Sequence, residues 1–109
     1  MATQNVRQTI ALAADGQLQK YVGTTATNIT KARIMSVQAQ SSAADGSVKI
    51  YNESDDSKTA SALVFEAKWG TADNSDFYVK IPGEGIYCDT GMYAVLSGCD
   101  FLVVTGTFT

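Results

Sequence analysis

Residues 62–69 read ALVFEAKW, and this stretch decides the fold class. One side of an extended chain carries only apolar residues, Leu63, Phe65, Ala67 and Trp69, whereas the other carries both charges, Glu66 and Lys68, beside Ala62 and Val64. A β-strand repeats its side-chain direction every second residue, whereas a helix would space its apolar residues by three or four. The stretch therefore predicts a β-strand with one face in the core.

The same alternation recurs in other segments of the chain. The expected inward sets are Met35, Val37 and Ala39 in residues 35–40, Val48 and Ile50 in residues 48–51, and Phe77, Val79 and Ile81 in residues 77–81. Helical spacing is nearly absent. Only residues 8–14 (QTIALAA) could be argued as a helix, and they fit a strand as well.

Turn residues separate these segments at short intervals. They are Asp15-Gly16, Asp45-Gly46, 52–57 (NESDDS), 71–76 (TADNSD), 82–85 (PGEG), Asp89-Thr90-Gly91 and Ser97-Gly98. Asp-Gly pairs tolerate the positive φ angles of tight hairpins. Alternating strands with turns every 8–12 residues predict an all-β antiparallel sandwich of jelly-roll or immunoglobulin-like type, with about seven or eight strands. We expect residues 1–5 to form a flexible arm and residues 6–109 a single domain.

The composition excludes several functional classes. The chain has no histidine, so it cannot build a Ser-His-Asp or Cys-His catalytic centre alone. Its net charge of −3 and its scattered basic residues argue against nucleic-acid binding. No segment has the length of a membrane span, and the N-terminus lacks the basic and apolar pattern of a secretory signal, so we expect synthesis in the cytoplasm. We predict a protein that is not an enzyme and that needs no cofactor.

The two cysteines, Cys88 and Cys99, are predicted to lie at the end of one strand and the start of the last. A disulfide would need their Cα atoms within about 7 Å, which the sequence leaves open. Cytoplasmic synthesis favours free buried thiols. Asp89 and Asp100 follow them directly and would raise the thiol pKa, which argues against a reactive cysteine.

The acidic clusters at 53–56 (ESDD) and 73–76 (DNSD) could supply oxygen ligands to Ca²⁺. Neither cluster has the spacing of the helix–loop–helix calcium site, so solvated loop tips are favoured and no metal is predicted. The glycines of residues 82–85 match no phosphate-binding pattern and predict a turn.

Aromatic residues are candidates for a carbohydrate or peptide platform, for a protein interface, or for core and rim packing: Tyr51, Trp69, Tyr78, Tyr87 and Tyr93. An interface between subunits or with a partner is favoured over a dedicated ligand platform. The candidate interface residues are Val6, Arg7, Ile10, Trp69 and Tyr93.

Residues 85–95 (GIYCDTGMYAV) resemble the C-terminal part of small virion structural proteins of tailed phages, especially marine and cyanobacterial ones. The similar pieces are a glycine (Gly85), a short strand (86–88), a turn ending in Met92-Tyr93, a last alternating strand (101–108) and the earlier SVKIYN segment (47–52). Residues 1–25 carry none of this likeness. The resemblance transfers no catalytic residue.

The resemblance implies a capsid decoration (cement) protein on the virion surface. Such a protein would bind the major capsid protein, stabilise the shell, and form a small homo-oligomer, with a trimer favoured. The alternative is a receptor- or glycan-binding module of a phage tail, spike or knob. Free edge strands also make self-association an expectation of the sandwich itself.

Overall fold

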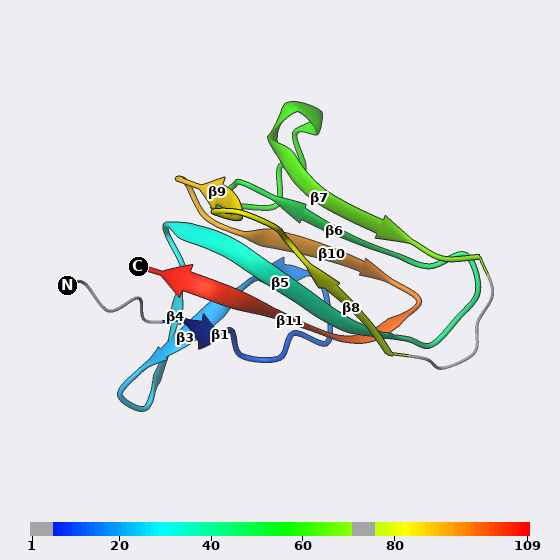
Figure 1. The fold of residues 1–109 in the computed structure, drawn as a ribbon, viewed down its shortest axis with the longest axis horizontal. Coiled ribbons are helices and arrows are strands. Elements are labelled where there is room, and N and C mark those ends of the chain that lie inside the picture. The colour runs from blue at the N-terminus through cyan, green and yellow to red at the C-terminus, as the bar shows by residue number, and fades with distance from the viewer. Residues whose placement is uncertain (1–5, 71–75) are drawn as a thin grey trace.

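The structure is a computed structural model that describes residues 6–70 and 76–109. Two antiparallel sheets contain most of the strands (Figure 1). Sheet A contains β1 (Arg7–Gln8), β11 (Cys99–Phe108), β5 (Ala32–Ser41), β8 (Asp76–Lys80) and β9 (Ile86–Cys88). Sheet B contains β2 (Gly16–Gln17), β10 (Tyr93–Ser97), β6 (Ser47–Tyr51) and β7 (Leu63–Lys68). A separate hairpin pairs β3 (Gln19–Val22) with β4 (Thr25–Asn28), and a single turn of 3₁₀ helix, η1 (Ala60–Ala62), precedes β7.

The order of the strands is that of a jelly roll. Sheet A runs β1-β11-β5-β8 and sheet B runs β2-β10-β6-β7, and the chain passes between the sheets at nearly every connection. β8 and β9 follow one another along the same side of β5, so they fill one position of the sheet. The β3–β4 hairpin is an insertion between β2 and β5. The predicted all-β sandwich is therefore confirmed, and its topology is the jelly roll.

The core lies between the two sheets and is built by alternating side chains of both. Its fully buried large members are Leu18, Ile29, Ile34, Ile50, Met92, Leu102, Val37, Val48, Val104 and Cys88. The predicted alternation holds in β8, where Phe77 and Val79 are half-buried and Tyr78 and Lys80 are exposed. It also holds in β7, where Phe65 is half-buried and Glu66 is exposed.

The expected inward set of β5 is wrong at Met35. In the ladder with β11, Thr105 lies opposite Ser36 but Gly106 lies opposite Ile34, so Met35 is an extra, unpaired residue. Such a bulge shifts the alternation by one position, and the fully buried residues become Ile34, Val37 and Ala39. A Cβ on Gly106 would collide with the carbonyl oxygen of Arg33, so glycine is required beside the bulge.

Most predicted turns within the described residues are observed, with one exception; the turn predicted at 71–76 lies mostly outside these residues. Asp45 has a positive φ of 56°, and Gly83, Gly85 and Gly98 also have positive φ angles. Asp15-Gly16 was expected to close a tight hairpin, but Gly16 begins β2 instead. The carboxylate of Asp15 accepts a hydrogen bond from the Leu96 backbone N–H at 2.8 Å, so this segment connects the two sheets and is not a hairpin turn.

Candidate functional site

The sandwich has two ends that differ in exposure. At one end the β3–β4 hairpin projects, and the N-terminal and C-terminal segments lie close to it (Figure 1). We call this the hairpin end and define it by Val6, Arg7, residues 19–28, Lys31, Arg33, Tyr87 and residues 107–109. The opposite end, defined by residues 42–46, Trp69, Ser97 and Gly98, is called the Trp69 end.

The Trp69 end is closed by backbone and side-chain contacts. The indole Nε1–H of Trp69 donates to the carbonyl oxygen of Ala43 at 2.8 Å, and its ring contacts that of Phe77 with centroids 5.6 Å apart. The backbone N–H groups of Ser42 and Ala43 both donate to the carbonyl of Gly98. These contacts join the loops of both sheets, so the residues of this end serve packing.

The hairpin end exposes apolar surface. Five large hydrophobic side chains in the described ranges are at least half exposed: Val6, Tyr21, Val22, Tyr78 and Tyr87. All except Tyr78 belong to the hairpin end. Tyr21 and Val22, each 56% exposed, stand next to the hairpin turn at Gly23 and Thr24. A group of exposed apolar residues on one part of a protein marks a contact surface more often than isolated ones do.

An open hollow of about 240 Å³ lies at the hairpin end, beside Tyr87. It is lined by Lys31, Ala32, Arg33, Tyr87 and residues 107–109. A smaller hollow of about 140 Å³ shares Arg33 and Thr107 with it and adds Met35, Gly83 and Glu84. Backbone hydrogen bonds fix the floor, because Thr109 donates to the carbonyl of Lys31 and accepts from the N–H of Thr30.

Arg33 and Tyr87 form the polar centre of the larger hollow. They are direct partners in the β5–β9 ladder, and Thr107 lies opposite Arg33 on β11. The guanidinium carbon of Arg33 lies 4.9 Å from the centroid of the Tyr87 ring, a cation–π contact. Within residues 6–70 and 76–109 the guanidinium makes no hydrogen bond or ion pair, so its donors face solvent.

Lys31 is the second cation of this surface. Hydrogen bonds from the Asn52 amide and the Thr90 hydroxyl lower the pKa of Asp89, and the positive charge of Lys31 contributes further. Asn52 also accepts hydrogen bonds from the backbone N–H groups of Thr90 and Gly91. Two cations, Lys31 and Arg33, therefore line the hollow. The Asp89 carboxylate interacts with Lys31 and is held in place by hydrogen bonds from Asn52 and Thr90.

The predicted interface residues separate into two groups. Val6 and Arg7 lie at the hairpin end, where Arg7 pairs with Gly106, and the Ile10 N–H donates to Gln19 at the base of the hairpin. Trp69 lies at the opposite end, and Tyr93 lies in the middle of sheet B, opposite Tyr51 and Gln17. The structure thus brings together the three N-terminal candidates but not the two aromatic ones.

Both cysteines are free. They lie at the predicted positions, the end of β9 and the start of β11. Burial, with a contribution from Asp89, raises the pKa of the Cys88 thiol to about 11. Burial also raises the pKa of Cys99, whose Sγ donates to the Phe101 carbonyl at 3.1 Å. Neither thiol has the lowered pKa of a nucleophile.

The first acidic cluster is engaged in local loop contacts. Glu53 accepts from the Thr59 N–H, and Asp55 accepts from the Ser57 N–H, each at 3.0 Å. Hydrogen bonds from the side chain of Ser57, and then from its backbone N–H, lower the pKa of Asp55. In the described part of the chain no group of acidic and cysteine side chains is arranged to hold a metal ion. Most of the second cluster, 73–75, lies outside the described residues.

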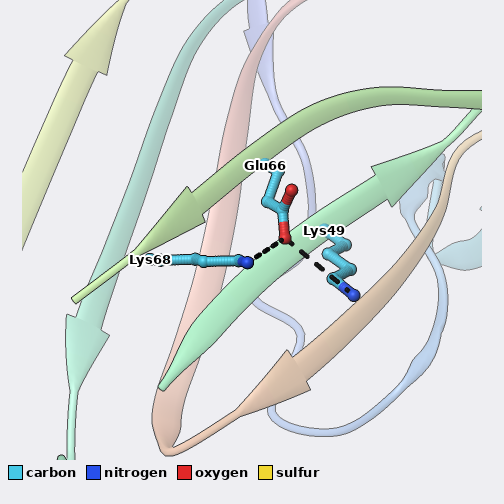
Figure 2. A network of polar contacts seen from close by, with 3 residues as sticks. All are labelled: Lys49, Glu66 and Lys68. Atoms are coloured by element: carbon cyan, nitrogen blue, oxygen red, sulfur yellow. Dashed lines mark ion pairs between the residues drawn. The ribbon is translucent and has the colours of Figure 1, made fainter. Parts of the chain in front are cut away.

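The outer face of sheet B carries a small charge network (Figure 2). Glu66 lies between Lys68, at 3.5 Å, and Lys49, at 3.9 Å. These side chains are between 31% and 71% exposed, so the ion pairs contribute at most about 1 kcal/mol each. The network places charges of both signs on β7, an edge strand of the sheet.

No family model, no curated protein and no solved structure matches the chain. No helix in residues 6–70 and 76–109 is long and apolar enough to cross a membrane. Sequence reasoning missed Tyr21, Val22 and Arg33; the only available signal was an apolar pair next to Gly23 in an otherwise polar segment.

Proposed function

We propose that this chain is a virion structural protein that acts by adhesion and not by catalysis, most specifically a capsid decoration protein. Its partner would be the major capsid protein, and its location the outer surface of the capsid. The observation that carries the proposal is the exposure of four large apolar side chains at the hairpin end, Val6, Tyr21, Val22 and Tyr87, together with an open hollow at that end lined by Tyr87. The resemblance of residues 85–95 to small virion proteins of tailed phages adds to it.

The hairpin end suits attachment to a protein surface. Tyrosine and arginine are enriched among the residues that dominate interface energies, because they bury much area and keep a polar tip. Arg33 offers unpaired donors to backbone carbonyls or carboxylates of the shell, while Tyr87 and Val6 supply apolar contact. Each contact would be small, but an oligomer that binds several symmetry-related sites gains affinity through its effective concentration.

A second candidate function is a receptor- or glycan-binding module of a tail, spike or knob. Jelly rolls occur in both viral capsid and lectin domains, so the fold does not choose between the two functions. The hollow favours this alternative in one respect. It combines a half-exposed aromatic ring, Tyr87, with the donors of Arg33 and the acceptor Glu84 of the adjoining hollow, groups that sugar hydroxyls can pair with.

Quantitative mass spectrometry of purified phage particles tests the proposal. A decoration protein should be present in hundreds of copies per particle. A chain that is absent, or present in a handful of copies, contradicts decoration; a handful of copies together with glycan-array binding by the isolated protein supports the tail or spike module.

Variants then locate the attachment surface. Recombinant protein is added back to particles that lack it, and we expect Tyr87→Ala to weaken binding by about tenfold or more. Tyr78→Ala is the matched control, because Tyr78 is 63% exposed but lies outside the hairpin end. Equal loss in both variants, or loss only in the control, contradicts attachment through the hairpin end.

A further inference from the structure

In the β3–β4 hairpin the outer edge of β4 has no described partner, whereas the outer edge of β3 receives one backbone hydrogen bond and carries Lys20. β3 pairs with β4 on one side, and its Gln19 carbonyl accepts the Ile10 N–H at 2.9 Å on the other. No described strand pairs with the outer edge of β4. An unpaired edge presents a row of backbone donors and acceptors that can pair with another chain.

The other free edges of the described fold carry features that oppose such pairing. β1 and β2 have two residues each and β9 has three, which is too short for an extended ladder. β7 exposes Glu66 and Lys68, and β8 exposes Lys80 two residues before Pro82. Short strands, charged side chains and proline are the usual protections of an edge. β4 has the sequence TATN, with no charge and no proline.

We propose that β4 pairs antiparallel with β4 of a second copy of this chain, about a two-fold axis at Ala26. The inference goes beyond the proposed function and does not depend on it. A second copy fits because the edge is complementary to itself: an uncharged strand brings no like charges together, whereas β7 or β8 paired with itself would bring lysines close.

The geometry of the hairpin selects Ala26 as the centre. Its loop has two residues, Gly23 and Thr24, so the flanking pair Val22–Thr25 is the hydrogen-bonded one. Because the ladder alternates, Ala26 directs its backbone N–H and C=O away from β3. Two copies related by the axis would then exchange both bonds at Ala26, and Thr24 would pair with Asn28 of the other copy.

The side chains on one face of this four-stranded sheet are also complementary. Tyr21 lies directly opposite Ala26, and both are exposed in the isolated chain. Pairing would place two alanines side by side at the axis, with a Tyr21 ring flanking them on each side. Directly opposite residues share one face of a sheet, so the rings would cover the small side chains and lose exposed area.

Size-exclusion chromatography with light scattering tests the pairing in the full chain. We expect a species of twice the 11.6 kDa of one chain. Ala26→Pro removes the outward N–H of both copies while sparing the hairpin ladder, and should weaken the dimer by about 30-fold, the loss of two hydrogen bonds. Ala26→Lys should also yield monomer, and an equimolar mixture of Ala26→Lys and Ala26→Glu should restore the dimer.

Ala13→Lys, the same change at an exposed alanine outside the hairpin, is the control and should remain dimeric. Circular dichroism of each variant verifies that the sandwich has folded. A wild-type chain that is monomeric at millimolar concentration, or that forms a trimer without two-fold contacts, overturns the proposal. So does a dimer that survives Ala26→Pro and Ala26→Lys unchanged. A low copy number in particles would contradict the decoration proposal without affecting this pairing. A monomeric wild-type chain would contradict the pairing without affecting the decoration proposal.

Discussion

At the Trp69 end an aromatic ring is packed and hydrogen-bonded, whereas at the hairpin end Tyr21 and Tyr87 leave at least half of their surface in solvent. Both ends belong to the same sandwich. The Trp69 end joins its loops through backbone hydrogen bonds and through the indole. The hairpin end carries an inserted hairpin, an open hollow and an arginine with free donors. The difference suggests that one end serves stability and the other serves contact.

The largest expected effect is at Gly46, in the Trp69 end. A Cβ there would lie 2.5 Å from the Ser97 carbonyl oxygen and from the Trp69 ring. We expect Gly46→Val to reduce the free energy of unfolding by about 3 kcal/mol or more, or to prevent folding. Urea denaturation measures the change.

The matched change at the hairpin end is Gly23→Ala. Nothing lies within 4 Å of a Cβ at Gly23, and only its positive φ of 64° opposes a side chain. The expected cost is about 1 kcal/mol. If Gly23→Ala were as harmful as Gly46→Val, the hairpin would be part of the stabilising structure and the comparison would fail.

Trp69 and Tyr87 should separate stability from binding. Trp69→Phe removes the indole hydrogen bond to Ala43 and should cost about 1–2 kcal/mol of stability, with binding to particles unchanged. Tyr87→Ala should show the reverse, since Tyr87 is 50% exposed and its ring contacts the Arg33 guanidinium. Thermal denaturation measures the stability of both variants, and a particle-binding assay measures their affinities. A shared loss of stability and binding in either variant would contradict the division of roles.

The buried thiol of Cys88 should make the stability of the protein depend on pH. The pKa of Cys88 rises from 9.0 to about 11 on burial, so the folded protein holds its thiol proton more tightly than the unfolded chain. Between these values the folded state binds more protons, and stability should fall as pH rises through the range. In Cys88→Ala the free energy of unfolding, measured as a function of pH, should no longer show this part of the decline. An unchanged profile would show that another group causes it.

Thiol labelling at neutral pH should distinguish Cys88 from Cys99. The thiolate is the reactive form, and both cysteines have a raised pKa, but Cys88 is fully buried and Cys99 only partly. We expect Cys99 to react slowly and Cys88 only when the sandwich opens, in the presence of denaturant. Equal rates in the native protein would mean that β9 separates easily from the core.

The smallest effect belongs to sheet B. Lys68→Ala removes one member of the exposed charge network with Glu66 and should change the free energy of unfolding by about 0.5 kcal/mol or less (Figure 2). Self-association and particle binding should be unchanged, because the outer face of sheet B lies outside the hairpin end. A loss of particle binding in Lys68→Ala would indicate that the contact surface lies at β7 and not at the hairpin end.

The sequence predicted the strands that follow a simple period of two, such as 63–69 and 77–81, because local alternation is enough to orient them. It failed at Met35, since the bulge depends on Gly106, a residue distant in the chain but adjacent in the sheet. Val6, Arg7 and Ile10 were anticipated at a common place because they are close in sequence. The grouping of Arg33 and Tyr87 around the hollow could not be anticipated, because β5, β9 and β11 come together only through the jelly-roll topology.

The most direct test of the central claim is amide hydrogen exchange of the protein, free and bound to particles. We expect slower exchange on binding at residues 6–7, 19–28 and 107–109 and at Tyr87, in the hairpin end, with no change at residues 42–46, 97 and 98 in the Trp69 end. Protection confined to the Trp69 end, or equal protection at both ends, would contradict the claim that the hairpin end is the contact surface.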